Sequence, residues 1–559
     1  MAKALLKNGK IALFAPYEDR ELCKQIDGRQ PCYEGKRFQH WEYPLRPEVL
    51  AAMRRTFPGL TIAPEVTRAV TAVEMREVVV AQMKDTGWEK AQPDESMPLK
   101  TKPFQCQVMG FNIGIKLPGT ALFMEQGCGK SLTAIAVMGR RFQRGEINRV
   151  LIIAPTSVVP VWAKEDVGEF AVHANFPYDV QALDGPIEKR IMALESWPEK
   201  GGLQVAVTNY EAVWRMEAEL ARWDPDMIIC DESQRIKTPG ARQSKAVHKL
   251  GRLAKYRMIL TGTPVTQGPL DLFSAFKFLD PGIFGNSFWA FKARYAVTGG
   301  FNGKQVVAYK NLPDLVRKAH SIAFRVTKAD ALDLPEFTDQ TLYCKLETKA
   351  KNIYEQMKKE SVAELSEERI ITATNVLSRL LRLSQLTGGY IGDGEGAIEQ
   401  VSAAKFNLLR ETVDDLLEVG KKVVIFARFI PEIHAIVRFL ENTNIGHACI
   451  MGSVKMEDRG EEVRRFQQDP DCRVFVAQIQ TAGLGITLTA ADTAIFYSLD
   501  YSFANLAQAQ CRIHRISQRN FVTYIYLVAE NTVDEKILQI LKKKKSVADM
   551  VVDGWRDLF

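Results

Sequence analysis

The sequence lacks the features that mark several large classes of protein. Its nine cysteines form no Cys-x-x-Cys pair and no ligand spacing with the seven histidines, which argues against a structural zinc or disulfide framework and favours a reducing compartment. No apolar run approaches the ~20 residues of a membrane span, and the first residues contain no apolar stretch typical of a secretory signal. Neither sign of charge dominates, because 74 basic and 67 acidic residues leave a net charge of +7. We therefore expect a cytoplasmic globular protein without a membrane partner, whose mild positive charge permits a polyanionic one.

What the chain does contain is a glycine-punctuated turn between an apolar run and an apolar helical pattern, at residues 121–137. Glycines without Cβ let the backbone close on a ligand, and the N–H groups at the start of the helix suit a polyphosphate. Lys130 would neutralise the terminal phosphates and Ser131 would hold Mg²⁺. The full phosphate-loop pattern is not met, because Met124 stands where the first glycine belongs. The alternative is a glycine turn that only joins a strand to a helix.

Short continuous apolar runs recur on both sides of the chain's midpoint, with helical patterns between most of them. Such runs are typical of strands buried on both faces, and their alternation with helices predicts parallel sheets of the α/β class. The first series lies at residues 150–155, 205–208, 227–230 and 258–264, and the second at residues 422–427, 447–451, 473–477, 493–497 and 522–528.

Two adjacent carboxylates, Asp231 and Glu232, follow one of these strands. Ligands bind at the carboxyl ends of strands in open α/β sheets. Asp231 is suited to hold Mg²⁺, and Glu232 to orient and deprotonate an attacking water. A solvated acidic helix start is the alternative. The order favours the catalytic interpretation, because the pair comes after the phosphate loop and before a Thr-Gly-Thr-Pro segment at residues 261–264.

Two arginines in the second half have a matching use. If residues 508–518 are helical, Arg512 and Arg515 are three apart and share a face. Guanidinium groups match phosphoryl oxygens bidentately, so the pair suits a γ-phosphate. His514 between them is expected to be structural, since no partner ligands stand nearby in sequence.

The segment to about residue 95 differs in composition from the rest, and residues 92–103 are expected to be a linker. Arg37, Trp41 and Tyr43 are suited to stack on bases or contact phosphates. Equally, the segment could be a small α+β domain with Trp41 and Tyr43 in its core. The sequence leaves both interpretations open.

Taken in their order along the chain, the motifs between about residue 102 and residue 531 resemble those of the Swi/Snf-type branch of superfamily-two helicase-like ATPases. Arg325-Val326-Thr327-Lys328 with Leu334-Pro335 is similar to the signature peculiar to that branch. The departures from the family pattern are Met124, Ala482, Cys511 and the Ser-Gln end of the Asp-Glu-Ser-Gln box. Residues 41–45 (Trp-Glu-Tyr-Pro-Leu) resemble the HARP-like module of annealing helicases.

The resemblance implies a fold and a domain plan. We expect two RecA-like parallel-sheet lobes with helical insertions and a small N-terminal α+β domain. The expected boundaries are residues 1–95 for an accessory domain that recognises DNA, 96–284 for lobe 1, 285–403 for a helical insertion and linker, 404–531 for lobe 2, and 532–559 for a C-terminal helical brace.

The resemblance also implies an activity, namely a monomeric ATP-dependent translocase on double-stranded DNA that uses ATP and Mg²⁺. Branched or fork DNA is a further expected partner, and the compact layout suggests a bacterial or phage protein. The alternatives are an annealing helicase acting on forks, an enzyme that unwinds RNA or DNA, and a nucleotide-dependent DNA clamp.

The residues that carry over from the family motifs fall into four sets. The catalytic set is Lys130, Asp231, Glu232, Arg512 and Arg515, and the metal set is Ser131 and Asp231. The nucleotide-binding set is Gln105 (as the adenine-sensing glutamine), Glu125, Gly127, Cys128, Gly129, Lys130, Ser131 and Gln508. The nucleic-acid set is Pro155, Thr156, Ser157, Thr208, Asn209, Thr481, Gly483 and Gly485.

Overall fold

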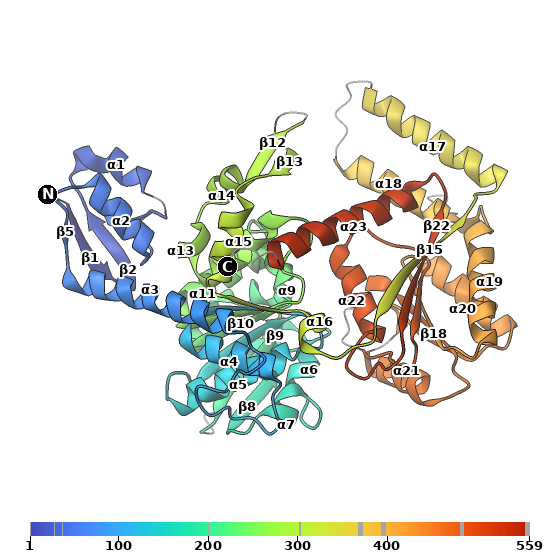
Figure 1. The fold of residues 1–559 in the computed structure, drawn as a ribbon, viewed down its shortest axis with the longest axis horizontal. Helices are drawn as coiled ribbons and strands as arrows, with labels where there is room; N and C mark the ends of the chain where they lie inside the picture. Colours follow the sequence, from blue (N-terminus) through green and yellow to red (C-terminus); the bar gives the residue numbers. More distant parts are fainter. Residues whose placement is uncertain are drawn as a thin grey trace. The chain divides into compact units, whose positions relative to one another are not determined.

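The chain divides into two units, Met1–Ala331 with Val547–Phe559, and Leu332–Ser546. The structure is a computed structural model that describes residues 2–553 apart from residues 27, 36, 199–200, 301–302, 304, 367–372, 393–397, 455 and 481–485, and the side chains of 360–377 and 455–457 are also not described. Figure 1 labels many of the elements along the chain. Among the described residues, none of the helices combines the length and apolarity that a membrane span requires.

The first unit begins with a small mixed sheet covered by helices. The sheet order is β3-β4-β2-β1-β5. Trp41 and Tyr43 belong to its buried core with Met53, and the Tyr43 hydroxyl donates to the carbonyl of Cys23 at 2.7 Å. The core interpretation of these two aromatic residues is therefore confirmed, and their use as stacking platforms is wrong. The elements are β1 (Lys3–Lys7), β2 (Lys10–Phe14), α1 (Arg20–Gln25), β3 (Gln30–Glu34), β4 (Arg37–Tyr43), α2 (Pro47–Thr56), β5 (Thr61–Ile62) and α3 (Pro64–Asp85).

Charged side chains fasten this N-terminal domain to the rest of the first unit. Arg46 is buried and forms ion pairs with Glu77 on α3 and with Asp280. Lys84, near the end of α3, donates to the carbonyls of His320 and Ala323. Burial lowers the pKa of Lys84 to about 7. The domain is thus anchored at two places, by Arg46 and by Lys84 near the end of α3.

The segment expected to be a linker, residues 92–103, is packed rather than loose. Glu95 forms ion pairs with Arg140 and Arg144, and Asp94 forms one with Lys116. Its prolines and lysines predicted irregular backbone, which the structure has, but side-chain charge pairs hold that backbone against the following domain.

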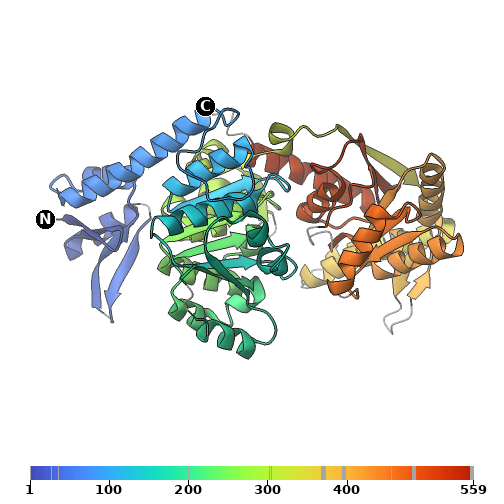
Figure 2. The same cartoon turned by 90° about the horizontal axis from the view of Figure 1, so that it is seen from below.

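A seven-stranded sheet follows, in the order β14-β6-β11-β10-β7-β9-β8, with parallel pairing throughout. Helices lie on both of its faces (Figure 2). The strands are β6 (Gly119–Met124), β7 (Arg149–Ala154), β8 (Tyr178–Ala182), β9 (Leu203–Asn209), β10 (Met227–Asp231), β11 (Tyr256–Leu260) and β14 (Ala323–Val326). The helices are α4 (Gln105–Lys116), α5 (Lys130–Gln143), α6 (Val159–Ala163), α7 (Glu169–His173), α8 (Ile187–Glu195), α9 (Tyr210–Val213), α10 (Glu217–Trp223), α11 (Arg242–Leu253), α12 (Leu272–Leu279), α13 (Pro281–Phe284), α14 (Phe288–Tyr295), α15 (Leu312–His320) and α16 (Lys328–Ala331), with a hairpin of β12 (Ala296–Gly299) and β13 (Gln305–Tyr309).

The second unit contains a six-stranded parallel sheet in the order β15-β22-β21-β18-β20-β19. Its core is built on Ile425, Ile495 and Leu527 of three adjacent strands. The strands are β15 (Phe337–Cys344), β18 (Val423–Ala427), β19 (His447–Ile450), β20 (Val474–Gln478), β21 (Thr493–Phe496) and β22 (Val522–Ala529). The other elements are α17 (Thr348–Ser366), α18 (Ala373–Thr387), β16 (Tyr390–Gly392), β17 (Ile398–Gln400), α19 (Ala404–Glu418), α20 (Ile430–Asn442), α21 (Met456–Gln468), α22 (Phe503–Ile513) and α23 (Val533–Val552).

The expected α/β class with two parallel sheets and an N-terminal α+β domain is confirmed. The segment expected to be a helical insertion, residues 285–403, also contributes a strand to each sheet. β14 pairs with β6 at an edge of the first sheet, and β15 pairs with β22 at an edge of the second. β15 is half exposed along its length, so it has no continuous apolar run to reveal it.

Candidate nucleotide site

The turn between β6 and α5, residues 125–130, has the backbone of a phosphate loop. Gly127 and Gly129 have φ values of 92° and 83°, a left-handed conformation that side chains other than glycine rarely adopt. The Lys130 side chain curls over the loop and donates to the carbonyls of Met124 at 3.1 Å and Glu125 at 3.4 Å. The lysine and the N-terminus of α5 therefore lie at one place, as the sequence predicts for a polyphosphate site.

Gln107, rather than Gln105, lies against this loop. The Gln107 amide accepts a hydrogen bond from the N–H of Phe104 at 2.9 Å and donates one to the carbonyl of Cys128 at 3.1 Å. A Cβ at Gly129 would lie 2.0 Å from that amide nitrogen, so the close approach requires glycine as much as the backbone angle does. The Gln105 side chain is exposed in the first turn of α4. The sequence carried no signal that separates Gln107 from Gln105, because both are polar residues in the first turn of the same helix.

Cys128 and Glu125, both expected to bind nucleotide, face other parts of the protein. The Cys128 side chain is fully buried, and burial raises the pKa of its thiol to about 12. The Glu125 carboxylate pairs with Arg325 at 2.9 Å and accepts the backbone N–H of Lys328 at 3.0 Å. Arg325 also pairs with Asp553 at 2.7 Å. These contacts connect the phosphate loop to residues 325–328, the segment that resembles the family signature. Glu125 therefore stabilises the conformation of the loop.

Asp231 lies at the end of β10 and is buried, with 6% of its surface exposed. Its two carboxylate oxygens accept hydrogen bonds from the Trp162 indole N–H at 3.0 Å and the Glu232 backbone N–H at 2.9 Å. Burial, and then the charge of Glu232, raise the pKa of Asp231 to about 6, while Lys130 acts to lower it. Each oxygen has one accepted hydrogen bond and a further lone pair, which fits a hard cation that prefers oxygen ligands.

Glu232 has an unusual backbone, with φ 49° and ψ 55°. A non-glycine residue in this region is strained, and such strain concentrates at functional sites. The Gln234 side chain donates to the Glu232 carboxylate at 2.8 Å and accepts the hydroxyl of Thr261 at 3.0 Å. Next to Thr261, Gly262 packs on the phosphate loop, where a Cβ would lie 3.2 Å from Glu125 Cα. The acidic box, the Thr-Gly-Thr-Pro segment and the phosphate loop are therefore joined in one continuous series of contacts.

Three of the expected nucleic-acid residues are connected through an arginine that the sequence analysis missed. Arg190 donates to Asn209 at 2.8 Å and to Thr208 at 3.3 Å, and Asn209 donates to Thr156 at 3.0 Å. Thr156 is exposed, whereas Thr208 is fully buried, so Thr208 can only position its neighbours. Pro155 and Ser157 beside this group are half-buried.

The two arginines of the second unit that are expected to suit a γ-phosphate converge on one carbonyl. Arg512 and Arg515 donate to the carbonyl of Ile486 at 3.4 Å and 3.3 Å, and Arg515 also donates to the Thr487 hydroxyl at 2.7 Å. They do not share a helix face, because α22 ends at Ile513. Gln508 is half-buried on α22. Thr481, Gly483 and Gly485 lie outside the described residues.

Two protein families match the chain. Residues 68–387 match the family described as SNF2-related domain, and residues 404–517 match the helicase conserved C-terminal domain. Because the first match alone covers more than half of the 559 residues, the chain belongs to the SNF2-related family of helicase-like ATPases. The resemblance of the motifs to Swi/Snf-type ATPases is confirmed, and that of residues 41–45 to a HARP-like module stays a prediction.

Several characterised and uncharacterised relatives are similar to the chain over about three quarters of its length. The uncharacterized ATP-dependent helicase MG018 of Mycoplasma genitalium is 26% identical over 430 residues, covering 77% of this chain and 40% of the relative. The transcription regulatory protein SNF2 of Saccharomyces cerevisiae is 26% identical over 455 residues, covering 77% of this chain and 26% of the relative. The chain thus spans well under half the length of these relatives. Among solved structures, the SWI2/SNF2 ATPase core of Sulfolobus solfataricus in complex with dsDNA is 26% identical with a TM-score of 0.39, covering 83% of this chain and 96% of that one.

Proposed function

We propose that this chain hydrolyses ATP and uses the energy to translocate on double-stranded DNA. The observation that carries the proposal is the continuous series of contacts in which Gln234 joins Glu232 to Thr261 and the adjacent Gly262 packs on the phosphate loop. A turn that only linked a strand to a helix would not need strained backbone, a buried carboxyl and a lysine at one place.

The residues have separate roles in this reaction. The phosphate loop and Lys130 bind and neutralise the terminal phosphates of ATP. Asp231 and the Ser131 hydroxyl would hold Mg²⁺, which supplies charge neutralisation at the phosphates. Glu232 orients the attacking water and accepts its proton. Arg512 and Arg515 stabilise the charge that develops on the transferred phosphoryl group.

Gln234 is proposed to couple hydrolysis to DNA. The Gln234 amide nitrogen contacts Glu232, the proposed general base, and the amide oxygen contacts Thr261 of the Thr-Gly-Thr-Pro segment. Any shift of that segment when DNA binds would move Glu232 relative to the phosphate loop. Hydrolysis would then be stimulated by DNA.

Contacts to DNA are proposed to go to phosphates, which carry no sequence information. Arg190 and Asn209 lie at the carboxyl end of β9 beside the exposed Thr156. The N-terminal domain is proposed as an accessory module that biases the enzyme towards branched or fork DNA. Since Trp41 and Tyr43 are core residues, that role would rest on exposed charges such as Arg37.

One set of assays on the full chain tests the proposal against its alternatives. ATP turnover is measured with duplex DNA, single-stranded DNA, RNA and fork DNA, beside displacement of a third strand from a triplex. We expect the largest stimulation by duplex and ATP-dependent triplex displacement. Separation of a partial duplex would instead indicate an unwinding helicase, fork reannealing an annealing helicase, and DNA binding without turnover a clamp.

A further inference from the structure

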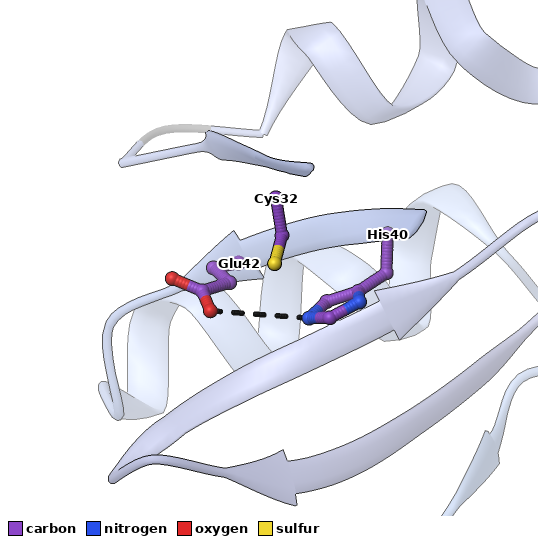
Figure 3. A group of neighbouring side chains, drawn as sticks. All are labelled: Cys32, His40 and Glu42. Carbon is purple, nitrogen blue, oxygen red and sulfur yellow. Dashed lines mark ion pairs between the residues drawn. The ribbon is translucent and has the colours of Figure 1, made fainter. Parts of the chain in front are cut away.

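The N-terminal sheet has a second face, opposite its helix-covered core, on which a cysteine, a histidine and a carboxylate meet. Cys32 on β3 lies directly across from His40 on β4, and Glu42 is two residues further along β4 on the same face. Their ligand atoms all lie within 4.8 Å of one another. Figure 3 shows the Cys32 sulfur, the His40 ring and the Glu42 carboxylate turned towards a common point.

The His40 side chain is buried without a hydrogen-bond partner among the described residues. It is 5% exposed, and neither of its ring nitrogens has a hydrogen-bond partner. The ring of Phe14 covers it at a centroid distance of 4.7 Å. A buried polar group without a partner is destabilising. The Nε2 atom of His40 lies 3.9 Å from Glu42 Oε1, too far for a hydrogen bond.

The surroundings leave one carboxylate oxygen facing the histidine. Glu42 Oε2 pairs with Lys10 at 2.6 Å, so Oε1 is the atom that faces His40. Cys32 is half-exposed and its thiol is free. Burial, and then the charge of Lys7, lower the pKa of His40.

We propose that Cys32, His40 and Glu42 form a Zn²⁺ site in the N-terminal domain. Thiolate, imidazole and carboxylate are the ligands zinc takes, and two deprotonated ligands balance its charge. Ligand atoms on a tetrahedral zinc lie about 3.5 Å apart, so small side-chain rotations would bring the three atoms, now within 4.8 Å, to bonding positions. The partial exposure of Cys32 leaves room for water at the fourth position.

The site would fasten an edge of the sheet. β3 is the edge strand, and its register with β4 shifts between Cys32 and Tyr33. Such a bulge interrupts the ladder and re-aims side chains. Zinc bound by Cys32 of β3 and by His40 and Glu42 of β4 would link the two strands where the bulge interrupts their hydrogen bonds.

Cobalt provides the probe, because Co²⁺ occupies zinc sites and its bond to a thiolate gives a charge-transfer absorption band. The full-length chain, reduced and stripped with a chelator, is titrated with Co²⁺ and then with Zn²⁺. We expect one equivalent of Co²⁺ to produce the thiolate band and Zn²⁺ to abolish it. The band should be lost in Cys32→Ser and weakened in Glu42→Gln.

Cys449→Ser is the matched control, since Cys449 is also a half-buried cysteine on a strand, and it should keep the band. Amide exchange gives a second readout, because Zn²⁺ should slow exchange in β3 and β4 of the wild type but not of Cys32→Ser. Metal-free exchange of Cys32→Ser should match the wild type, which shows that the variant folds. Absence of the band, its persistence in Cys32→Ser, or its loss in Cys449→Ser would overturn the proposal.

Discussion

Each of the two parallel sheets has a buried carboxyl close to the carboxyl end of a central strand. Asp231 ends β10 of the first sheet, and Glu432 lies in the first turn of α20, which follows β18 of the second. Burial raises the pKa of Asp231 to about 6 and that of Glu432 to about 7. By burial and pKa alone the two would be equal candidates for catalysis.

Their neighbours separate them. Asp231 is next to Glu232 and under the influence of the Lys130 charge, beside a glycine loop with a helix N-terminus. Glu432 closes its own helix end, accepting the Ser498 hydroxyl at 2.5 Å and the Phe429 N–H at 3.1 Å. Its other oxygen has no hydrogen-bond partner and lies where a Cβ on Gly388 would be 1.9 Å away. A perturbed carboxyl thus indicates a nucleotide site only when groups that bind phosphate surround it.

The largest expected effect is on the phosphate loop itself. Lys130→Ala should abolish DNA-stimulated ATP turnover, because no other side chain of the loop carries a positive charge. Its melting temperature should stay close to the wild type, since only two hydrogen bonds to loop carbonyls are lost. Lys245→Ala, an exposed lysine on α11, is the control. Retained turnover in Lys130→Ala would remove the basis for distinguishing Asp231 from Glu432.

The second unit should contribute to catalysis through Arg512 and Arg515 rather than through the buried carboxyl of Glu432. Arg515→Ala should lower kcat by a factor on the order of 10³ or more while nucleotide affinity stays nearly unchanged. Steady-state kinetics and equilibrium binding of a fluorescent nucleotide measure the two quantities, with the exposed Arg519→Ala as control. A parallel loss of affinity would mean that Arg515 contacts the nucleotide before the transition state.

The pH dependence of kcat/KM should follow the protonation of Asp231 and should not depend on the protonation of Glu432. With a pKa of about 6 in the free enzyme, Asp231 becomes protonated below that pH and can no longer hold a cation. We expect kcat/KM to fall about tenfold per pH unit below pH 6. Glu432→Gln should leave this acid limb in place, and a limb that moved in that variant would reverse the assignment.

Trp162→Phe should shift that limb. The indole N–H donates to Asp231 and favours its charged form, so its loss should raise the pKa of Asp231 further. The acid limb of kcat/KM should move to higher pH while activity at pH 8 changes by only a few-fold. Trp289→Phe, at a tryptophan that is 76% exposed, should leave the profile unchanged.

The smallest effect on activity is expected for Glu432→Gln, whose consequence is for stability. The folded-state pKa of Glu432, about 7, lies above its ordinary 4.5. Stability from this group is therefore fully present below pH 4.5 and lost as pH rises through 7. At pH 8 the neutral glutamine should raise the free energy of unfolding by up to about 3 kcal/mol, and at pH 4 by little. Denaturant unfolding at both pH values measures the difference, and destabilisation at pH 8 would show that the charged form is needed.

The central strands and the phosphate loop could be predicted because their signals are local. Strands such as β7 and β10 are buried on both faces and therefore consist of continuous apolar residues. The edge strands β8 and β15 are half-exposed, so their composition resembles that of loops. β14 is only four residues long and contains Arg325, whose charge interrupts the pattern although its partners bury it.

Residues that act through tertiary contacts were harder to predict. Gln107 and Gln105 are two positions apart on one helix, and only packing shows which of them touches the loop. The linear spacing of Cys32, His40 and Glu42 resembles no common zinc motif, because the residues meet across a strand pair. Arg512 and Arg515 meet at the carbonyl of Ile486, but the shared helix face expected for them is wrong, because α22 ends before Arg515.

The chain passes between the two units twice, once after Ala331 and again after Ser546. The second passage runs inside α23, whose end is held to Arg325 by Asp553. Removing the residues after Ser546 would therefore take Asp553 away from Arg325 and leave Glu125 as its ion-pair partner among the described residues, so the end of the chain contributes to the support of the phosphate loop.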